Sequence, residues 1–94
     1  MIIINADDFG LNSSVNKAIV EAFSNGLINS TTLMANMSGF EEAVDLANKY
    51  EFTQRIGAHL VLTEGSPLTE EIKSLDFLFN GITCYKKSRY LIFF

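Results

Sequence analysis

The chain has 94 residues, enough for one small domain but on the low side for an enzyme of the α/β kind. Its formal net charge of −4 argues against nucleic acid as a partner, since a nucleic-acid-binding surface shows as a basic face. The single cysteine, Cys84, excludes an internal disulfide framework and is interpreted as an ordinary thiol. No signal-peptide pattern opens the sequence, and its early apolar run is too short to span a bilayer. We therefore expect a cytoplasmic protein with no membrane partner.

The first ten residues, MIIINADDFG, join an apolar run to two adjacent carboxylates. The three isoleucines at positions 2–4 are β-branched and uninterrupted, which predicts a strand buried on both faces, as in a parallel sheet covered by helices. Asp7 and Asp8 then stand at the carboxyl end of that strand, where ligands bind in open α/β sheets and (β/α) barrels. Neighbouring carboxylates repel each other, and a bound metal ion or separate roles as base and ligand would offset that repulsion. The simpler interpretation is that Asp8 or Asn12 only caps the next helix.

Two amphipathic helices alternate with three strands in the predicted order. Apolar side chains at positions 15, 18, 19, 22 and 23 have helical spacing, with Ser13 or Ser14 as the cap and Gly26 as the left-handed residue after the end. Residues 40–50 predict the second helix, and residues 27–37 and 55–62 predict the second and third strands. Strands that alternate with helices over short connections are typical of parallel βαβ units, so we expect an α/β fold.

His59 is the only histidine, and it lies near the end of the third predicted strand. A lone histidine is more often a hydrogen-bonded structural residue than a ligand. If the first and third strands are near neighbours, however, His59 reaches the pocket of the aspartates. One carboxylate and one imidazole are two ligands of a hydrolytic metal site, which ordinarily takes a third and keeps a position open for water. Asn36, near the end of the second strand, is a candidate substrate contact, although most asparagines in such places only satisfy loop backbone.

The sequence changes in character after the third strand. Residues 63–69 predict either a substrate lip or an ordinary βα turn, and residues 69–75 predict a short helix. Residues 77–94 contain six of the eleven aromatic residues, three of the seven basic residues and no acid. We therefore expect a domain over residues 1–76 and an atypical tail over residues 77–94, which is either out of frame or a terminal strand.

Several segments together resemble the YdjC-like carbohydrate deacetylases, a family that includes the chitooligosaccharide deacetylases. They are NADDFG at 5–10, the helix beginning near 15–16, STTLM at 30–34, GAHL at 57–60 and TEGSPL at 63–68. The similarity runs from residue 1 to about residue 75, with matching order and spacing. It implies a (β/α) barrel-like fold, a divalent metal that is most often magnesium with zinc as the alternative, and removal of acetyl groups from N-acetylated oligosaccharides.

The resemblance also implies roles for individual residues. Asp7 resembles the general base that activates water, and Asp8 and His59 resemble metal ligands, while Asn36 is placed near the sugar from its position alone. Family members are more than twice this length and supply a second metal-binding histidine from a later part of the barrel. This sequence contains no other histidine. We therefore expect the parallel βαβαβ portion of a truncated deacetylase that is inactive alone, with an open apolar sheet edge that favours self-association.

Two other interpretations stay open. The chain is alternatively a binding or assembly module that completes its sheet and its metal site with a partner chain. A purely structural small domain is the third interpretation, but it gives no reason for two acids and the only histidine to stand at the ends of the first and third strands.

Overall fold

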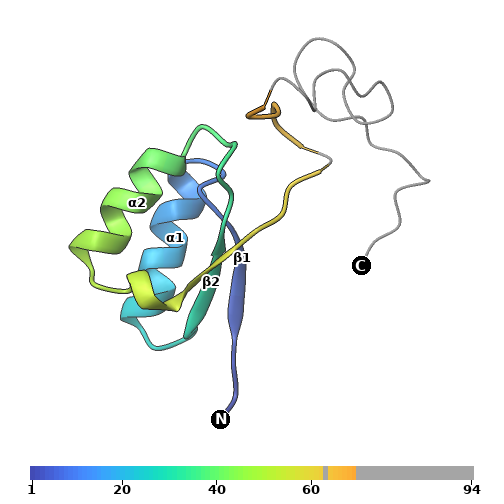
Figure 1. The fold of residues 1–94 in the computed structure, drawn as a ribbon. Helices are drawn as coiled ribbons and strands as arrows, with labels where there is room; N and C mark the ends of the chain where they lie inside the picture. Colours follow the sequence, from blue (N-terminus) through green and yellow to red (C-terminus); the bar gives the residue numbers. More distant parts are fainter. Residues whose placement is uncertain (63, 70–94) are drawn as a thin grey trace. The chain divides into compact units, whose positions relative to one another are not determined.

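The computed structural model describes residues 1–62 and 64–69. The elements follow one another as β1 (Asn5–Phe9), α1 (Ser13–Ser24), β2 (Ser30–Leu33), α2 (Phe40–Lys49), the short 3₁₀ helix η1 (Thr53–Arg55) and β3 (Ile56–Ala58) (Figure 1). The chain divides into two compact units, Met1–Leu60 and Val61–Phe94, and all of these elements belong to the first. None of the helices in the described part of the chain is long and apolar enough to cross a membrane. Cys84, residues 70–75 of the helix predicted at 69–75 and the boundary predicted at residue 76 fall outside the described residues.

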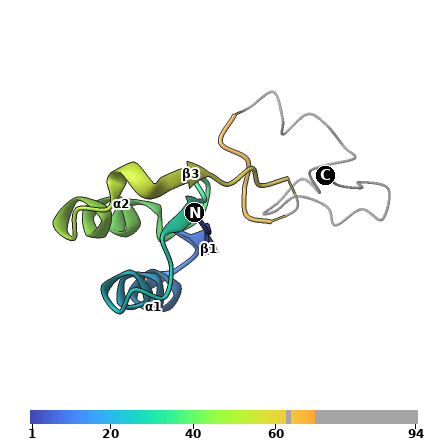
Figure 2. The same cartoon turned by 90° about the horizontal axis from the view of Figure 1, so that it is seen from below.

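The three strands form one parallel sheet in the order β1-β2-β3. Helices α1 and α2 lie side by side on the same face of this sheet, as Figures 1 and 2 show from two directions. Within the Met1–Leu60 unit the other face carries no helix, and we call it the open face. The prediction of a parallel βαβαβ arrangement of the α/β class is confirmed.

Both ends of α1 are fixed by local hydrogen bonds. The Asn12 side chain accepts a hydrogen bond from the backbone N–H of Val15 at 2.9 Å, so Asn12 is the N-cap, and neither of the two predicted serines takes that role. At the other end Gly26 has φ +71°, and the backbone N–H of Leu27 donates to the Ala22 carbonyl at 2.9 Å. This pattern is a Schellman motif, as the position of Gly26 predicted.

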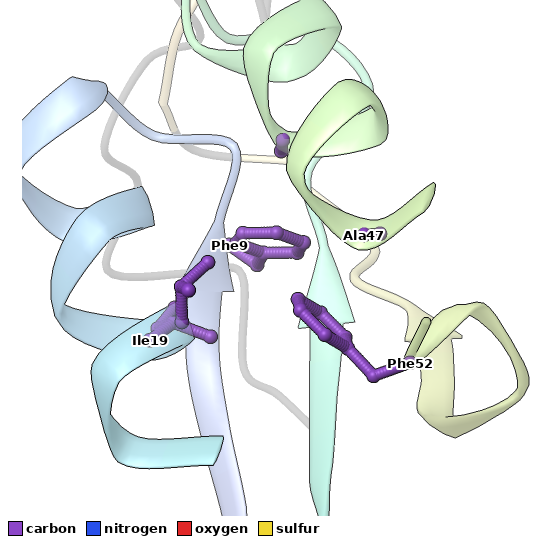
Figure 3. Packing of buried hydrophobic residues seen from close by; sticks show 6 residues of the cluster. Phe9, Ile19, Ala47 and Phe52 are labelled. Carbon is purple, nitrogen blue, oxygen red and sulfur yellow. The ribbon is translucent and has the colours of Figure 1, made fainter. Parts of the chain in front are cut away.

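The core lies between the helices and the sheet, and its buried apolar members are Phe9, Ile19, Val20, Ala43, Ala47 and Phe52. The rings of Phe9 and Phe52 lie 5.7 Å apart between their centroids, in the space between the sheet and the helices (Figure 3). The predicted stripe on α1 is partly wrong, because Ala18 is exposed while Asn16 is fully buried. The buried face of α1 therefore includes one amide side chain.

The expectation of a first strand buried on both faces is wrong. β1 begins at Asn5, and the isoleucines at positions 2, 3 and 4 are 78%, 69% and 52% exposed. Asn29 holds this segment extended, since its side chain accepts from the N–H of Ile4 at 2.8 Å and donates to the Ile2 carbonyl at 2.7 Å. The helices cover one face of β1 from Ala6 onward, and within the described residues no strand pairs with its second edge.

β2 and β3 are also shorter than predicted. β2 ends at Leu33 because residues 35–39 form turns before α2, and the 3₁₀ helix η1 occupies residues 53–55 before β3. Beyond Ala58, His59 still donates its backbone N–H to the Leu33 carbonyl at 3.0 Å. The carboxyl ends of the strands therefore stay aligned up to His59.

Candidate active site

A β-bulge shapes the end of β1. Ala6 pairs with Thr31 and Phe9 pairs with Leu33, so three steps along β1 correspond to two along β2. Asp7 and Asp8 occupy the extra length, and Asp8 has φ +70°, a left-handed conformation that is rare for a residue with a side chain. Bulges re-aim side chains, and strained backbone of this kind often occurs at functional sites.

The bulge brings Asp8 to His59. The distance between Asp8 Oδ1 and His59 Nδ1 is 3.5 Å, although β2 lies between β1 and β3. The Asp8 side chain is 49% exposed and that of His59 is 28% exposed, so the pair lies at the edge of the solvent. Nδ1 itself is buried and makes no hydrogen bond within the described residues, and its contact with Asp8 is not one. The sequence predicted that the ends of the first and third strands lie close together. The structure confirms this, although β2 separates the two strands.

Asp7 lies on the open face and has different neighbours. Its Oδ1 accepts a hydrogen bond from the Asn5 side chain at 2.8 Å and lies 3.5 Å from the Thr32 hydroxyl. The register pairs Thr32 with Gly57, and His59 follows two residues later, so strand alternation places His59 on the same face. Because of the bulge, the side chains of the consecutive residues Asp7 and Asp8 both lie on the open face of the sheet.

Asn36 lies half-buried in the loop between β2 and α2, at the carboxyl end of the sheet as predicted. Its contact with a sugar stays a prediction. The loop predicted as a substrate lip belongs to the second unit, in which Pro67 is buried and Gly65 has φ +70°.

Asp8 and His59 suit a shared divalent cation. A carboxylate oxygen and a neutral imidazole nitrogen are ordinary ligands for such ions, and two ligands each about 2.1 Å from a tetrahedral ion are roughly 3.4 Å apart. The observed separation of 3.5 Å and the unbonded Nδ1 fit that arrangement. Within residues 1–62 and 64–69 no group of three or more His, Cys, Asp or Glu side chains is placed to hold a metal ion. The described residues therefore bring two potential donors together.

Comparison with known proteins identifies the family of the chain. The family model described as YdjC-like protein matches residues 1–86, which is most of the chain. The chain belongs to the YdjC-like family.

Relatives of this YdjC-like chain carry a common name. A carbohydrate deacetylase of Brevibacillus brevis is 53% identical over 74 residues, which cover 79% of this chain and 29% of the relative. A carbohydrate deacetylase of Clostridium beijerinckii is 50% identical over 74 residues, which cover 79% of this chain and 30% of the relative. This YdjC-like chain thus spans about a third of the length of the curated relatives it matches.

A solved structure supports the same fold. A protein of Enterococcus faecalis V583, titled as a candidate cellobiose-phosphate cleavage protein, superposes with a TM-score of 0.78 and 32% sequence identity. The match covers 94% of this YdjC-like chain and 34% of the other.

Sequence reasoning missed two features of the candidate site in this YdjC-like chain. The bulge depends on how two strands pair, and the sequence of β1 alone carries no sign of it. Asn16 was missed because a polar residue in an amphipathic helix is expected to face water, whereas its side chain is fully buried. A signal was present, since Asn16 stands three and four residues from the apolar Ile19 and Val20.

Proposed function

We propose that this chain contributes the amino-terminal part of the active site of a metal-dependent carbohydrate deacetylase, which hydrolyses the acetamide group of N-acetylated oligosaccharides. The observation that carries the proposal is the pair Asp8 and His59, 3.5 Å apart at the carboxyl end of a parallel sheet. The names of the relatives support the deacetylase chemistry.

The proposed roles follow from the positions of the side chains. Asp8 and His59 hold a divalent cation, magnesium or zinc. When bound, such an ion polarises a carbonyl group and makes water easier to deprotonate. Asp7 is exposed on the same face and accepts the proton from the attacking water, as a general base must do within hydrogen-bonding reach. Asn36, in the loop after β2, contacts the sugar.

We also propose that the 94-residue chain alone does not catalyse deacetylation. Hydrolytic metal sites ordinarily use three protein ligands, while this sequence has one histidine and its described residues bring two donors together. Purified chain with magnesium or zinc is therefore expected to release no acetate from N,N′-diacetylchitobiose. Acetate release at a rate that Asp7→Asn abolishes would contradict inactivity of the chain alone.

The deacetylase proposal itself is tested in a chimera. The 74-residue segment of the Brevibacillus brevis relative that matches this chain is exchanged for the segment from this chain. We expect the chimera to release acetate, and we expect Asp7→Asn to lower kcat at least 100-fold, the lower range for loss of a general base. His59→Gln is expected to lower activity through loss of the metal ion.

Asn48→Ala is the matched control for the chimera, because Asn48 is exposed on α2 and, within the described residues, its side chain bonds to the Val44 carbonyl of the same helix. It should leave kcat unchanged. A folded chimera without activity would refute the deacetylase proposal, and full activity in Asp7→Asn would refute the role of Asp7.

A further inference from the structure

Asn16 is a fully buried polar side chain that the proposed chemistry does not use. Its Oδ1 accepts a hydrogen bond from the backbone N–H of Gly10 at 2.7 Å, and its Nδ2 donates to the Gly39 carbonyl at 2.9 Å. Nδ2 also donates to Glu42 Oε1 at 3.1 Å. A buried amide lowers stability unless its hydrogen bonds are made, and here both of its ends are bonded.

These bonds join two loops that touch through their backbones. A methyl group at Gly39 would lie 2.8 Å from the Gly10 carbonyl oxygen, and one at Gly10 would lie 2.9 Å from the Met34 carbonyl oxygen. The loop after β1 and the loop after β2 therefore meet where only glycine fits. Asn16 lies beneath this contact and bonds to one loop through its acceptor and to the other through its donor.

The contact lies directly beside the proposed ligands. Gly10 is two residues beyond Asp8, and the N–H of Leu11 donates to the Asp8 carbonyl at 3.1 Å, closing a turn that begins at the left-handed Asp8 and has Gly10 at its third position. A conformation of this kind persists only where the surroundings hold it. The Asn16 side chain supplies such a hold, because it fixes the N–H of Gly10 inside the turn.

Backbone hydrogen bonds connect the end of β1 to His59 through the end of β2. The Phe9 carbonyl accepts from the N–H of Met34 at 2.8 Å, and the Leu33 carbonyl accepts from the N–H of His59 at 3.0 Å. His59 is therefore held by β2. If the loop after β1 loosens, Asp8 moves relative to His59 and the distance between the two side chains changes.

We propose that Asn16 is a positioning residue: through Gly10 and Gly39 it holds the Asp8 carboxylate at the distance from His59 at which both side chains bind one divalent cation. This inference rests on the proposed function, because it presupposes the metal site of Asp8 and His59.

The test measures binding of Zn²⁺ alone to the full 94-residue chain by calorimetry, with urea unfolding recorded for each variant. We expect the parent chain to bind Zn²⁺, and Asp8→Asn and His59→Gln to abolish the binding. Asn16→Ala is expected to weaken the affinity at least tenfold while the chain stays folded. If Asp8→Asn and His59→Gln leave the affinity unchanged, the metal site itself is refuted, and this inference falls with it.

Two controls separate positioning from a general loss of stability. Phe23→Leu weakens the core at the last turn of α1, the end of that helix away from Asn16, because it removes the ring that stacks on Phe52. Glu42→Gln retains an acceptor for Asn16 while both loop bonds remain. Both should bind Zn²⁺ within twofold of the parent. If Asn16→Ala is folded and also binds within twofold, the metal site stands and the positioning role is refuted.

A second measurement needs no variant at Asn16. If the Asn16–Gly10 bond and the cation site are coupled, binding of either strengthens the other. Zn²⁺ should therefore slow amide hydrogen exchange at Gly10 severalfold more than at Gly26, which lies at the other end of α1. Equal effects on the two glycines would overturn the inference.

Discussion

Asn5 and Asp7 stand two residues apart on β1 and are joined by a 2.8 Å hydrogen bond from the Asn5 amide to Asp7 Oδ1. We have proposed Asp7 as a general base, and a general base works well only when the oxygen that takes the proton points at the water. Because Asn5 occupies one oxygen of the carboxylate, it restricts the rotation of the other. Orientation at this site is therefore supplied by the neighbouring residue on the same strand.

The hydrogen bond between Asn5 and Asp7 leads to a prediction for Asn5. In the deacetylase chimera we expect Asn5→Ala to lower kcat roughly tenfold, a fraction of the 10² to 10⁴ that a general base contributes, because the carboxylate remains but rotates freely. KM should stay within twofold if Asn5 does not touch the substrate. The measurement is steady-state acetate release, with Asn48→Ala as the unaffected control. A rise in KM at constant kcat would assign Asn5 to substrate binding instead.

Three glycines at the ends of the elements differ in why a side chain is unfavourable there. One reason is a left-handed backbone conformation, and the other is crowding by a neighbouring loop. Gly26 has φ +71° with nothing within 4 Å of a methyl group placed on it. Gly39 has an ordinary φ of −89°, but a methyl group there would lie 2.8 Å from the Gly10 carbonyl oxygen. Gly10 combines φ +94° with a crowded position, because a methyl group placed there would lie 2.9 Å from the Met34 carbonyl oxygen. Neither of those close neighbours is a flexible side chain that can move aside.

Replacing each of the three glycines by alanine should lower the free energy of unfolding by different amounts. Gly26→Ala should lower the free energy of unfolding by about 1 kcal/mol, the usual penalty of a left-handed side chain. Gly39→Ala should lower it by about 1–3 kcal/mol through overpacking. Gly10→Ala carries both penalties and should lower it by the largest amount. Urea unfolding checks the order, and a Gly10→Ala loss no greater than that of Gly26→Ala would contradict the close contact of the loops.

The elements also show what the sequence can predict. Helix α2 was predicted within one residue, because its apolar spacing and terminal charges are local properties of the chain. The bulge in β1 and the left-handed Asp8 were not, because register arises between two strands. The meeting of Asp8 and His59 was predicted as a consequence of parallel topology, which aligns the carboxyl ends of strands.

On the scale of the whole molecule, burial is the property that sequence predicted least well. The isoleucines at positions 2–4 have the pattern of a buried strand but are exposed, because burial depends on which elements cover a strand. Asn16 shows the reverse, a polar residue whose burial depends on two loops and a second helix. Both errors come from contacts between segments distant in sequence.

The exposed isoleucines, and the edge of β1 that pairs with no strand of the described residues, lead to a prediction about assembly. Burying an isoleucine contributes about 1.5–3 kcal/mol, and an open strand edge offers unpaired backbone groups to another chain. We therefore expect the 94-residue chain to self-associate, with a mass by light scattering that rises with concentration. Replacing Ile2 and Ile4 together by lysine should shift it toward the monomer, because charged residues oppose pairing at an edge.

The control for assembly must change the net charge equally. Ser14→Lys with Asn48→Lys adds the same two charges at exposed positions on α1 and α2, away from β1, and should leave the association unchanged. If this double lysine variant is as monomeric as the variant with lysine at positions 2 and 4, association is governed by net charge and not by the edge of β1. A parent chain that is monomeric at every concentration would refute self-association through β1. A discrete dimer would favour the assembly interpretation, in which a second copy completes the sheet, because hydrogen bonding at one edge satisfies one partner at a time.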